Sequence, residues 1–334
     1  MNIKDYYPEK FAYSRPYVKK MVKKFNFIHP TAEYCMPFAC FFMSMGVEMM
    51  DEMPLAASYI LYNNTGRNII DIPAFLCKLL KKTDIGDVCI DNVMLPFNTV
   101  YVHFGECIAF RIQGKDSRVE GAYVTKIEID DIMLLEFTLI LTECSRRYIK
   151  FSFQGEKGGG VSIMNALIDI SLSNKVGDTV SGSYADILVC LKKYSHDDFS
   201  SEICRIIRES AELIINAILF FINREKDVRL STTDMRATNL LQQLGERKKS
   251  QERTKIIQKL SKFSYSKIFI LGENLKKEYE CMWTGKEVAP HWRRGHWRHQ
   301  PYGQGLAENK LIWINPTIVR RDKGKPEKGH VYEF

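Results

Sequence analysis

The run "DFSSEICRIIRESAELIINAILFFINRE", residues 198–225, is the stretch on which the fold depends. Its apolar side chains recur at the i, i+3, i+4 spacing of an α-helix, and Asp198 or Ser200 precedes them as an N-cap. The middle and later turns are apolar nearly all round, which indicates burial on every side. We therefore expect a central core helix that packs against a sheet.

The sheet is predicted from the segments between residues 88 and 155. These short runs are rich in β-branched and aromatic residues, and Gly, Asn, Asp and Ser separate them. The pattern is typical of a meandering antiparallel sheet. The runs are "NTVYVHFGE", "CIAFRIQG", "GAYVTKIEIDD", "LLEFTLILTE" and "RYIKFSFQG".

Helices are predicted over residues 1–84. "SRPYVKKMVKKFNF" (14–27) places Pro16 near a helix start, and "CMPFACFFMSMGVEMM" (35–50) has the composition of an adaptable core. "NIIDIPAFLCKLLKKT" (68–83) ends in lysines, which the negative end of a helix dipole favours. Pro73 either kinks this helix or marks its true beginning.

Three regions follow from these patterns. Residues 1–223 form an α+β body with helices over 1–84, mainly strands over 88–155 and helices over 160–225. Residues 224–262 are polar and charge-dense, which predicts a charged linker or a solvated helical arm. Residues 263–334 contain the strand-like runs "SKIFILG" (266–272) and "NKLIWINPTIV" (309–319), and we expect a small basic module containing β-strands there. The predicted fold class is α+β.

The charge of the chain is distributed unevenly. The net charge is +8, but residues 224–334 contain 24 Lys and Arg against 13 Asp and Glu, a net of +11, whereas the first 223 residues have a net of −3. All four tryptophans and four of the seven histidines fall in the last 52 residues. Such a region attracts phosphate backbones or acidic partners, although a solvated basic surface has the same composition.

Membrane insertion and a disulfide framework are not expected. The longest apolar run, "ELIINAILFFIN" (212–223), is shorter than the roughly 18 residues that a membrane span needs. The N-terminus lacks the apolar core of a signal peptide. Nine cysteines are scattered without CxxC pairs, which favours a reducing compartment. We therefore expect a cytoplasmic protein with no membrane partner.

The run "PHWRRGHWRHQPYGQG" (290–305) is the candidate functional motif. A metal site using Cys281 and the three histidines is disfavoured, because arginines crowd the ligands and no second cysteine pair is present. A nuclease centre is disfavoured because residues 288–307 contain no carboxylate to assist a general base. Neither a catalytic residue nor a cofactor is predicted.

Recognition of a charged partner suits the composition of this motif better. Its arginines can contact phosphate or carboxylate in a bidentate manner, its Trp and Tyr rings can stack, and its glycines allow tight turns. In an extended strand, Gly295, Trp297 and His299 point to one side, while His296 and Arg298 point to the other. The alternative is that an arginine–tryptophan stack merely braces the C-terminal fold, and composition leaves this choice open.

The motif, together with "WINP" (313–316), resembles the C-terminal signature of a family carried by phages and mobile elements, that of the type V-A anti-CRISPR protein number two. The matching residues are Pro290, His291, Arg293, Arg294, Gly295, His296, Trp297, Gly303, Gly305, Trp313 and Pro316. Residues 95–105, 121–130 and 212–228 resemble the family more weakly and in the same order. The first ninety residues show little resemblance.

The resemblance implies an inhibitor that recognises the nascent N-terminal peptide of a type V CRISPR effector nuclease and lowers its mRNA. By this analogy residues 1–223 bind the peptide, and residues 263–334 contact RNA or the ribosome. The binding residues are expected among the matched positions and Arg298. The alternative is an RNA-binding protein or an RNase of a phage or plasmid, which would use His296 and Arg294. We favour a protein without catalytic activity of its own.

Overall fold

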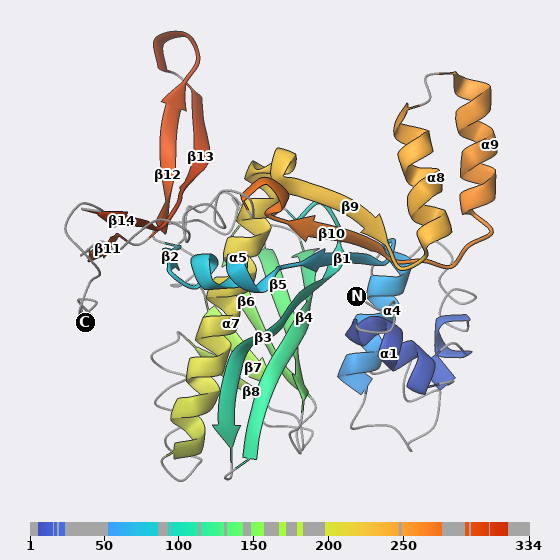
Figure 1. The fold of residues 1–334 in the computed structure, drawn as a ribbon. Coiled ribbons are helices and arrows are strands. Elements are labelled where there is room, and N and C mark those ends of the chain that lie inside the picture. Colours follow the sequence, from blue (N-terminus) through green and yellow to red (C-terminus); the bar gives the residue numbers. More distant parts are fainter. Residues whose placement is uncertain are drawn as a thin grey trace.

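The computed structural model describes much of the chain. The described residues are 6–15, 17–18, 20–23, 53–85, 93, 95–112, 115–129, 132–142, 148–156, 167–171, 179–182, 198–246, 249–275, 291–293, 295–306 and 308–319. The predicted helical segment over 35–50 lies outside them. No helix among the described residues is long and apolar enough to cross a membrane. Helices and a large sheet form an α+β structure, which confirms the predicted class (Figure 1).

A nine-stranded sheet forms the centre of the molecule, in the order β8-β7-β6-β5-β4-β3-β1-β10-β9. Six of these strands form an antiparallel meander, and the four of them between residues 99 and 156 confirm the meander predicted over residues 88–155. They are β3 (Thr99–Ile112), β4 (Lys115–Ile129), β5 (Ile132–Thr142), β6 (Tyr148–Glu156), β7 (Leu167–Ser171) and β8 (Thr179–Gly182).

The structure corrects the helices predicted over residues 160–225. In this range β7 and β8 are strands, and the helix begins only at Asp198. The sequence of β7, "LIDIS", alternates apolar and polar residues over its last four positions, which suits a strand with two different faces. The prediction overlooked this period because the segment is short.

The remaining three strands join the sheet from distant parts of the sequence. Strand β1 (Asn68–Asp71) runs parallel to both β3 and β10 (Lys267–Leu271), and β10 pairs with β9 (Val228–Thr232) in an antiparallel manner. The sheet is therefore mixed rather than purely antiparallel. Residues assigned from sequence to the body, the charged linker and the C-terminal module all contribute to it.

Strand β1 also corrects the helix predicted over residues 68–83. The helix in this stretch is α5 (Ala74–Leu80), and Pro73 occupies its N-cap, so the proline marks the beginning of the helix rather than a kink. Proline disfavours a helical conformation at the preceding residue, Ile72, and the β-branched Ile69 and Ile70 suit a buried strand.

Helix α7 (Asp198–Asn223) covers one face of the sheet and contacts β3 and α5. Every residue from Leu213 to Phe220 is buried, which confirms the predicted core helix. The helix shares one hydrophobic cluster with Val100, Val102 and Phe104 of β3. Alternate residues of a strand point to opposite faces, and these three lie on the face that α7 covers.

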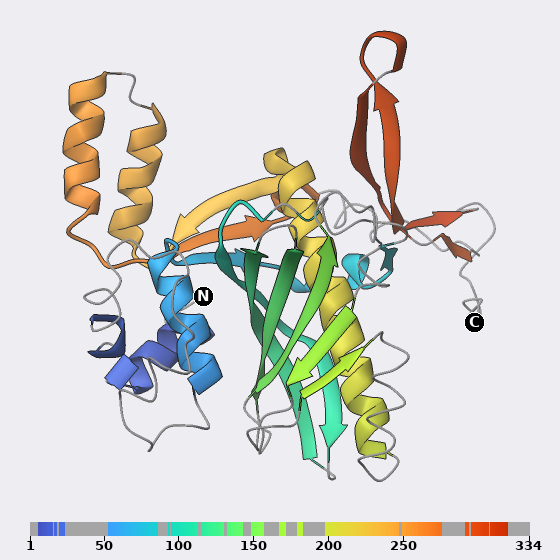
Figure 2. The ribbon, with the colours of Figure 1, turned by 180° about the vertical axis from the view of Figure 1, so that it is seen from behind.

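The other face of the sheet is covered by α1 (Tyr7–Ser14) and α4 (Met53–Asn64). Helix α4 contacts β3, β4 and β5, and both helices share a second hydrophobic cluster with Tyr101 of β3 and Tyr123 of β4. Figure 2 shows these two helices and α7 on separate sides of the strands. The sheet is thus a central layer with helices on both faces.

Two hairpins project from this layered body. Helices α8 (Met235–Glu246) and α9 (Ser250–Leu260) form one of them, in the stretch for which a linker or helical arm was expected. Strands β12 (Gly295–Tyr302) and β13 (Glu308–Ile314) form the other. Both rise on the same side of the molecule at opposite ends, and β9 runs between them (Figures 1 and 2).

Candidate functional site

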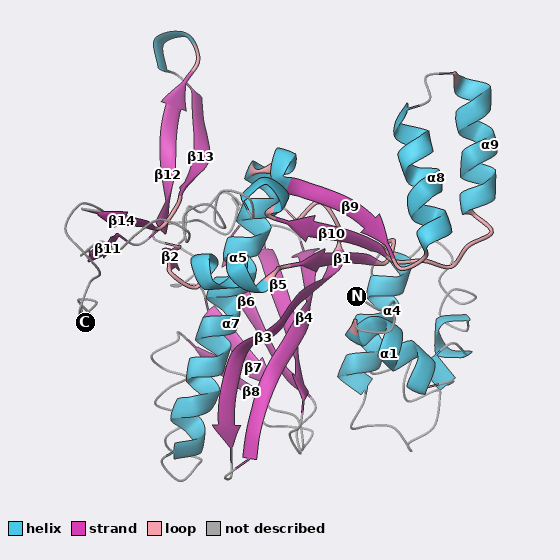
Figure 3. Ribbon diagram, in the orientation of Figure 1, coloured by secondary structure: helices cyan, strands magenta, loops and turns pink. Residues whose placement is uncertain are grey.

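The C-terminal signature builds the projecting β12–β13 hairpin, which Figure 3 shows standing clear of the body. Three short strands lie at its base. Strand β2 (Thr83–Asp84) pairs in parallel with the start of β12, and β11 (His291–Arg293) pairs with β14 (Thr317–Val319). At the tip, Gly303 and Gly305 have φ angles of 79° and 68°, which other residues adopt only with strain.

The two signature tryptophans anchor the base of the hairpin. Trp297 and Trp313 are paired across the strands and are only 8% and 6% exposed. The Trp313 ring packs edge-to-face on Phe220 of α7, with 5.1 Å between ring centroids. Both indole rings belong to the same hydrophobic cluster as α7, so the hairpin is rooted in the central core.

Asn216 connects this anchor to the middle of α7. Trp297 Nε1 donates a 2.8 Å hydrogen bond to Asn216 Oδ1. Asn216 Nδ2 in turn donates to the carbonyl oxygens of Leu80 and Thr83, at 3.2 and 3.0 Å. A single buried amide therefore holds α7, the end of α5, β2 and β12 together.

Thr83 and Gly295 complete the anchor. Thr83 Oγ1 accepts a 3.2 Å hydrogen bond from Trp313 Nε1 and donates to the Leu79 carbonyl. Gly295 lies so close to Thr83 and Pro316 that a Cβ atom on it would be 2.7 Å from both Thr83 Oγ1 and the Pro316 ring. The glycine and the proline of the signature thus meet in a close contact that a larger residue would disrupt.

The outer part of the hairpin is exposed and carries mixed polar groups. Arg298 and His299 are exposed on β12, and Arg298 donates a hydrogen bond to Gln300. Lys310 Nζ lies 5.4 Å from the centroid of the Tyr302 ring, a cation–π contact. A hydrogen bond with Glu308 raises the pKa of Tyr302 above its ordinary value. Arg298, Tyr302 and Lys310 share one face of the hairpin and His299 lies on the other; together these four exposed residues are called the hairpin surface.

The structure divides the predicted binding residues into two groups. Gly295, Trp297, Trp313 and Pro316 are buried in the anchor, His296 is half-buried, and Arg298 is exposed. Gly303 and Gly305 shape the tip. His291 and Arg293 lie in β11, while Arg294, like Pro290 and Cys281, falls outside the described residues. A role in binding stays a prediction for these residues except Pro290 and Cys281, for which none was predicted.

Burial follows the expected alternation of the strand only at its base. Gly295 and Trp297 are buried, but His299, which should share their side, is exposed because β12 has by then left the body. The tryptophans brace the C-terminal fold, and their partners among the described residues are Asn216, Thr83 and Phe220. Sequence reading missed Asn216 and Thr83, although an amide inside the apolar run 212–223 was a signal for a buried polar contact.

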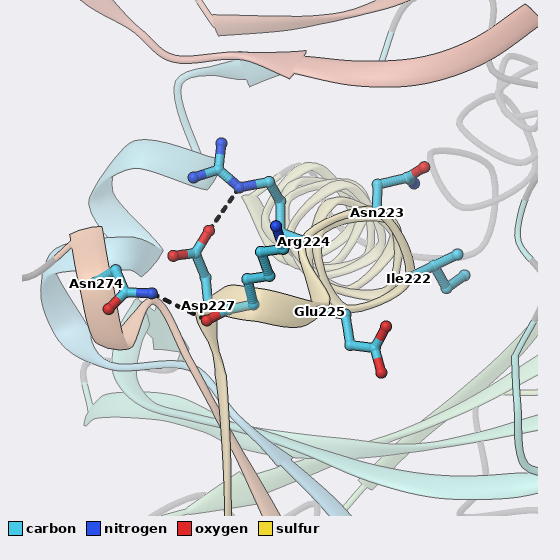
Figure 4. Close-up of a pocket in the computed structure, with 7 residues that line it drawn as sticks. Ile222, Asn223, Arg224, Glu225, Asp227 and Asn274 are labelled. Atoms are coloured by element: carbon cyan, nitrogen blue, oxygen red, sulfur yellow. Dashed lines mark hydrogen bonds and ion pairs between the residues drawn. The ribbon is translucent and has the colours of Figure 1, made fainter.

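A second candidate site lies where α7 ends. A surface hollow there is lined by Ile222, Asn223, Arg224, Glu225, Lys226, Asp227 and Asn274 (Figure 4). Arg224 Nε lies 2.6 Å from Asp227 Oδ2, and Asn274 Nδ2 donates to the carbonyl oxygen of Lys226. The 3₁₀ turn Glu225–Asp227 leads from this hollow directly into β9.

Strand β9 is the last strand of the sheet, and no described strand pairs with its outer edge, which lies beside the hollow. The backbone N–H of Thr232 donates to Thr238 Oγ1, away from β10. Backbone groups of an antiparallel strand alternate in direction, so the N–H and C=O of Leu230 also point away from β10. The Leu230 side chain is 41% exposed. An extended peptide could pair with this edge through main-chain hydrogen bonds.

Within the part of the chain that the structure describes, no group of three or more His, Cys, Asp or Glu side chains is placed to hold a metal ion. The hairpin surface includes a histidine, cations and a phenol. This arrangement is suited to contacting a phosphate or carboxylate group.

Comparisons with known proteins agree on one family. The model of the anti-CRISPR type V subtype A2 family, described as AcrVA2-like, matches residues 70–321, well over half of the chain. A solved structure described as "Crystal structure of AcrVA2" is similar with a TM-score of 0.50 and 17% sequence identity, covering 94% of this chain and 97% of the other. At that identity the likeness shows a shared fold. No match was found among curated protein sequences.

Proposed function

We propose that the chain, which belongs to the anti-CRISPR type V subtype A2 family, inhibits a type V CRISPR system by lowering expression of its effector nuclease. In this proposal the protein binds the effector's N-terminal peptide as the peptide leaves the ribosome, and the effector's mRNA is then lost. The observation that carries the proposal is the family match over residues 70–321, which spans the signature hairpin, the sheet and α7.

The edge of β9 and the adjacent hollow are the proposed peptide site, so the site lies mainly in residues 224–274 rather than in residues 1–223, to which the sequence assigned it. A nascent N-terminus is extended and has no tertiary structure, so it can add to a sheet as a further strand. Leu230 supplies one outward-facing N–H and one C=O for such pairing. Arg229 and Glu273, which form an exposed ion pair with 3.1 Å between Nε and Oε2, flank the same edge. Opposite charges beside the edge offer contacts to polar side chains of the peptide.

The hairpin surface is the proposed contact with RNA or the ribosome. It combines two cations, Arg298 and Lys310, with the exposed ring of Tyr302. Arg binds phosphate through its planar guanidinium, and an aromatic ring stacks on bases. The buried anchor holds this surface away from the body, where it can reach a large partner.

A reporter experiment tests the proposal. Messages that begin with the opening codons of type V effectors are followed in cells with and without this protein, beside messages whose opening codons are scrambled. We expect selective loss of effector-led messages. The variant Arg298→Ala/His299→Ala/Lys310→Ala should restore them, whereas Lys20→Ala/Lys78→Ala, at exposed lysines of the body, should not.

The other outcomes assign the protein differently. If both messages fall alike, the protein acts on RNA without regard to the nascent peptide. Cleavage of naked RNA by the pure protein, without ribosomes, would identify an RNase instead. If neither message falls under any effector sequence, the proposed mechanism is wrong.

A further inference from the structure

A second basic surface lies on the helical hairpin, outside the C-terminal signature. Residues 249–262 contain five Lys or Arg and one acidic residue, so this stretch alone has a net charge of +4. Lys255, Lys259 and Lys262 are all exposed. Residues 1–223 have a net charge of −3, so the positive charge of this stretch is a local feature.

The three lysines form one stripe along α9. They stand at i, i+4 and i+7, a spacing that places side chains on the same flank of a helix. Lys262 follows the end of α9, and its backbone N–H still donates to the carbonyl of Lys259 at 3.2 Å, which continues the helical path. The packed face is different: Ile256 and Leu260 turn toward α8 and join Ala237 in a small cluster.

Among the described residues, no carboxylate forms an ion pair with this stripe. Some lysines of the body do pair with carboxylates, as Lys10 does with Glu120 at 2.9 Å and Lys150 with Glu136 at 2.8 Å. Among the described residues, none of the three lysines on α9 has an ion-pair partner within 4.0 Å. Three like charges held on one flank repel one another, and a polyanion that bound there would relieve this repulsion.

We propose that the α8–α9 hairpin binds the phosphate backbone of RNA through Lys255, Lys259 and Lys262. A membrane surface fits less well, because a helix that lies in a membrane exposes a continuous apolar face, and α9 exposes a single large apolar side chain, Ile257. Lysine binds phosphate as a point charge, without regard to sequence. The choice of RNA over DNA rests on the proposed function, in which the protein acts on a message.

The hairpin geometry supports this assignment. The α8–α9 hairpin stands away from the body on the same side as the β12–β13 hairpin (Figure 1). A helix that stands free can approach a phosphate backbone without a clash from the body. The two hairpins therefore offer two separated contacts to one large polyanion.

Fluorescence anisotropy of the full-length protein with a labelled single-stranded RNA tests the proposal. We expect the affinity of the wild-type protein to fall as the salt concentration rises between about 50 and 200 mM. In the variant Lys255→Gln/Lys259→Gln/Lys262→Gln, the slope of log K against log salt should flatten by about 2, because each lost phosphate contact removes roughly 0.7 from the slope for a single strand. The matched control is Lys20→Gln/Lys23→Gln/Lys78→Gln, which removes the same charge from exposed lysines elsewhere and should leave the slope within about 0.5 of wild type.

Each other outcome overturns the inference. An unchanged slope in the α9 variant, an equal change in the control, or no RNA binding at the lowest salt would each do so. If polyglutamate binds the protein more tightly than RNA does, and this binding is lost in the same variant, the stripe is reassigned to an acidic protein partner. The assay contains no peptide, ribosome or reporter, so its failure is separate from a failure of the proposed function. Circular dichroism of each variant establishes that it is folded.

Discussion

At the scale of single residues, Asn216 joins more elements than any other side chain of the anchor. One amide accepts from the Trp297 indole and donates to two carbonyl oxygens in a buried setting. Buried polar groups that lose their partners pay the full cost of desolvation. The polar residue in the most apolar part of α7 is therefore explained by the hairpin that it anchors.

Replacement of this amide should destabilise the fold. Asn216→Ala leaves the indole N–H and two carbonyls without their partner, and we expect the free energy of unfolding to fall by about 2–4 kcal/mol. Urea denaturation measures the change. Asn223→Ala, the same substitution at the exposed end of the same helix, should cost less than about 1 kcal/mol. Equal losses in the two variants would contradict the role assigned to Asn216.

Gly295 provides a second test of the anchor. In Gly295→Ala the new methyl group meets Thr83 and Pro316 at 2.7 Å, and we expect a loss of about 1–3 kcal/mol from overpacking. Gly245 in α8 has open space around it, so Gly245→Ala should instead stabilise the protein by about 0.5–1 kcal/mol. The two substitutions should therefore shift the melting temperature, measured by thermal denaturation, in opposite directions. A shift in the same direction would refute the close contact at Gly295.

Asp71 makes the stability depend on pH. Burial raises the pKa of its carboxyl group to about 6, and the hydroxyl of Tyr6, which donates to Oδ2 at 3.1 Å, opposes that rise. Because the folded pKa exceeds the unfolded value, the stabilising contribution of Asp71 is complete below about pH 4 and is lost as the pH rises through 6. The variant Asp71→Asn should not lose stability in this way, because its amide does not titrate.

The comparison of wild type with Asp71→Asn isolates this group from other carboxylates. We expect the variant to gain stability relative to wild type as the pH rises from 4 to 7, by up to about 3 kcal/mol. Asn can still accept the hydrogen bond from Tyr6. Chemical denaturation at several pH values measures the difference. A difference that stays constant across this range would show that Asp71 titrates normally.

At the scale of elements, the sequence predicts those whose pattern is long and local. Helix α7 was predicted because its period persists over many turns, and the meander because successive strands pair with their neighbours in sequence. Strands β1, β9 and β10 were not placed in the sheet. Asn68 pairs with Lys267, and no local pattern records a partner two hundred residues away.

The anchor was hidden from sequence for the same reason. A buried tryptophan and a stacking tryptophan have the same local sequence, and only the position of Asn216 and Thr83 distinguishes them. The signature was therefore recognised correctly as a family feature, while the burial of Trp297 and Trp313 required the structure. Gly303 and Gly305, whose turn role needs only local backbone geometry, were predicted.

Strand β9 gives a prediction at this scale. Leu230→Pro removes an N–H that faces away from β10, so the ladder within the sheet is kept, as an edge strand tolerates. We expect a folded protein that no longer suppresses effector-led messages. Leu230→Thr keeps the N–H and should retain suppression. If Leu230→Pro suppresses as well as wild type while folded, the peptide does not pair with this edge.

At the scale of the whole molecule, the proposed binding surfaces are arranged around one sheet. The edge of β9 lies between the two projecting hairpins, one bearing the hairpin surface and the other the lysine stripe of α9 (Figures 1 and 2). A peptide held at the edge would be flanked by two surfaces suited to RNA. This arrangement explains how one chain could recognise a nascent peptide beside the message that encodes it.

The most direct test of the account asks whether the peptide or the RNA sequence is recognised. Two reporters are compared in cells that make this protein: one encodes the effector's opening peptide with synonymous codons, and the other keeps nearly the same nucleotides in a shifted reading frame. We predict that the synonymous message is lost and the frame-shifted message is kept. Loss of the frame-shifted message, with survival of the synonymous one, would contradict recognition of the nascent peptide.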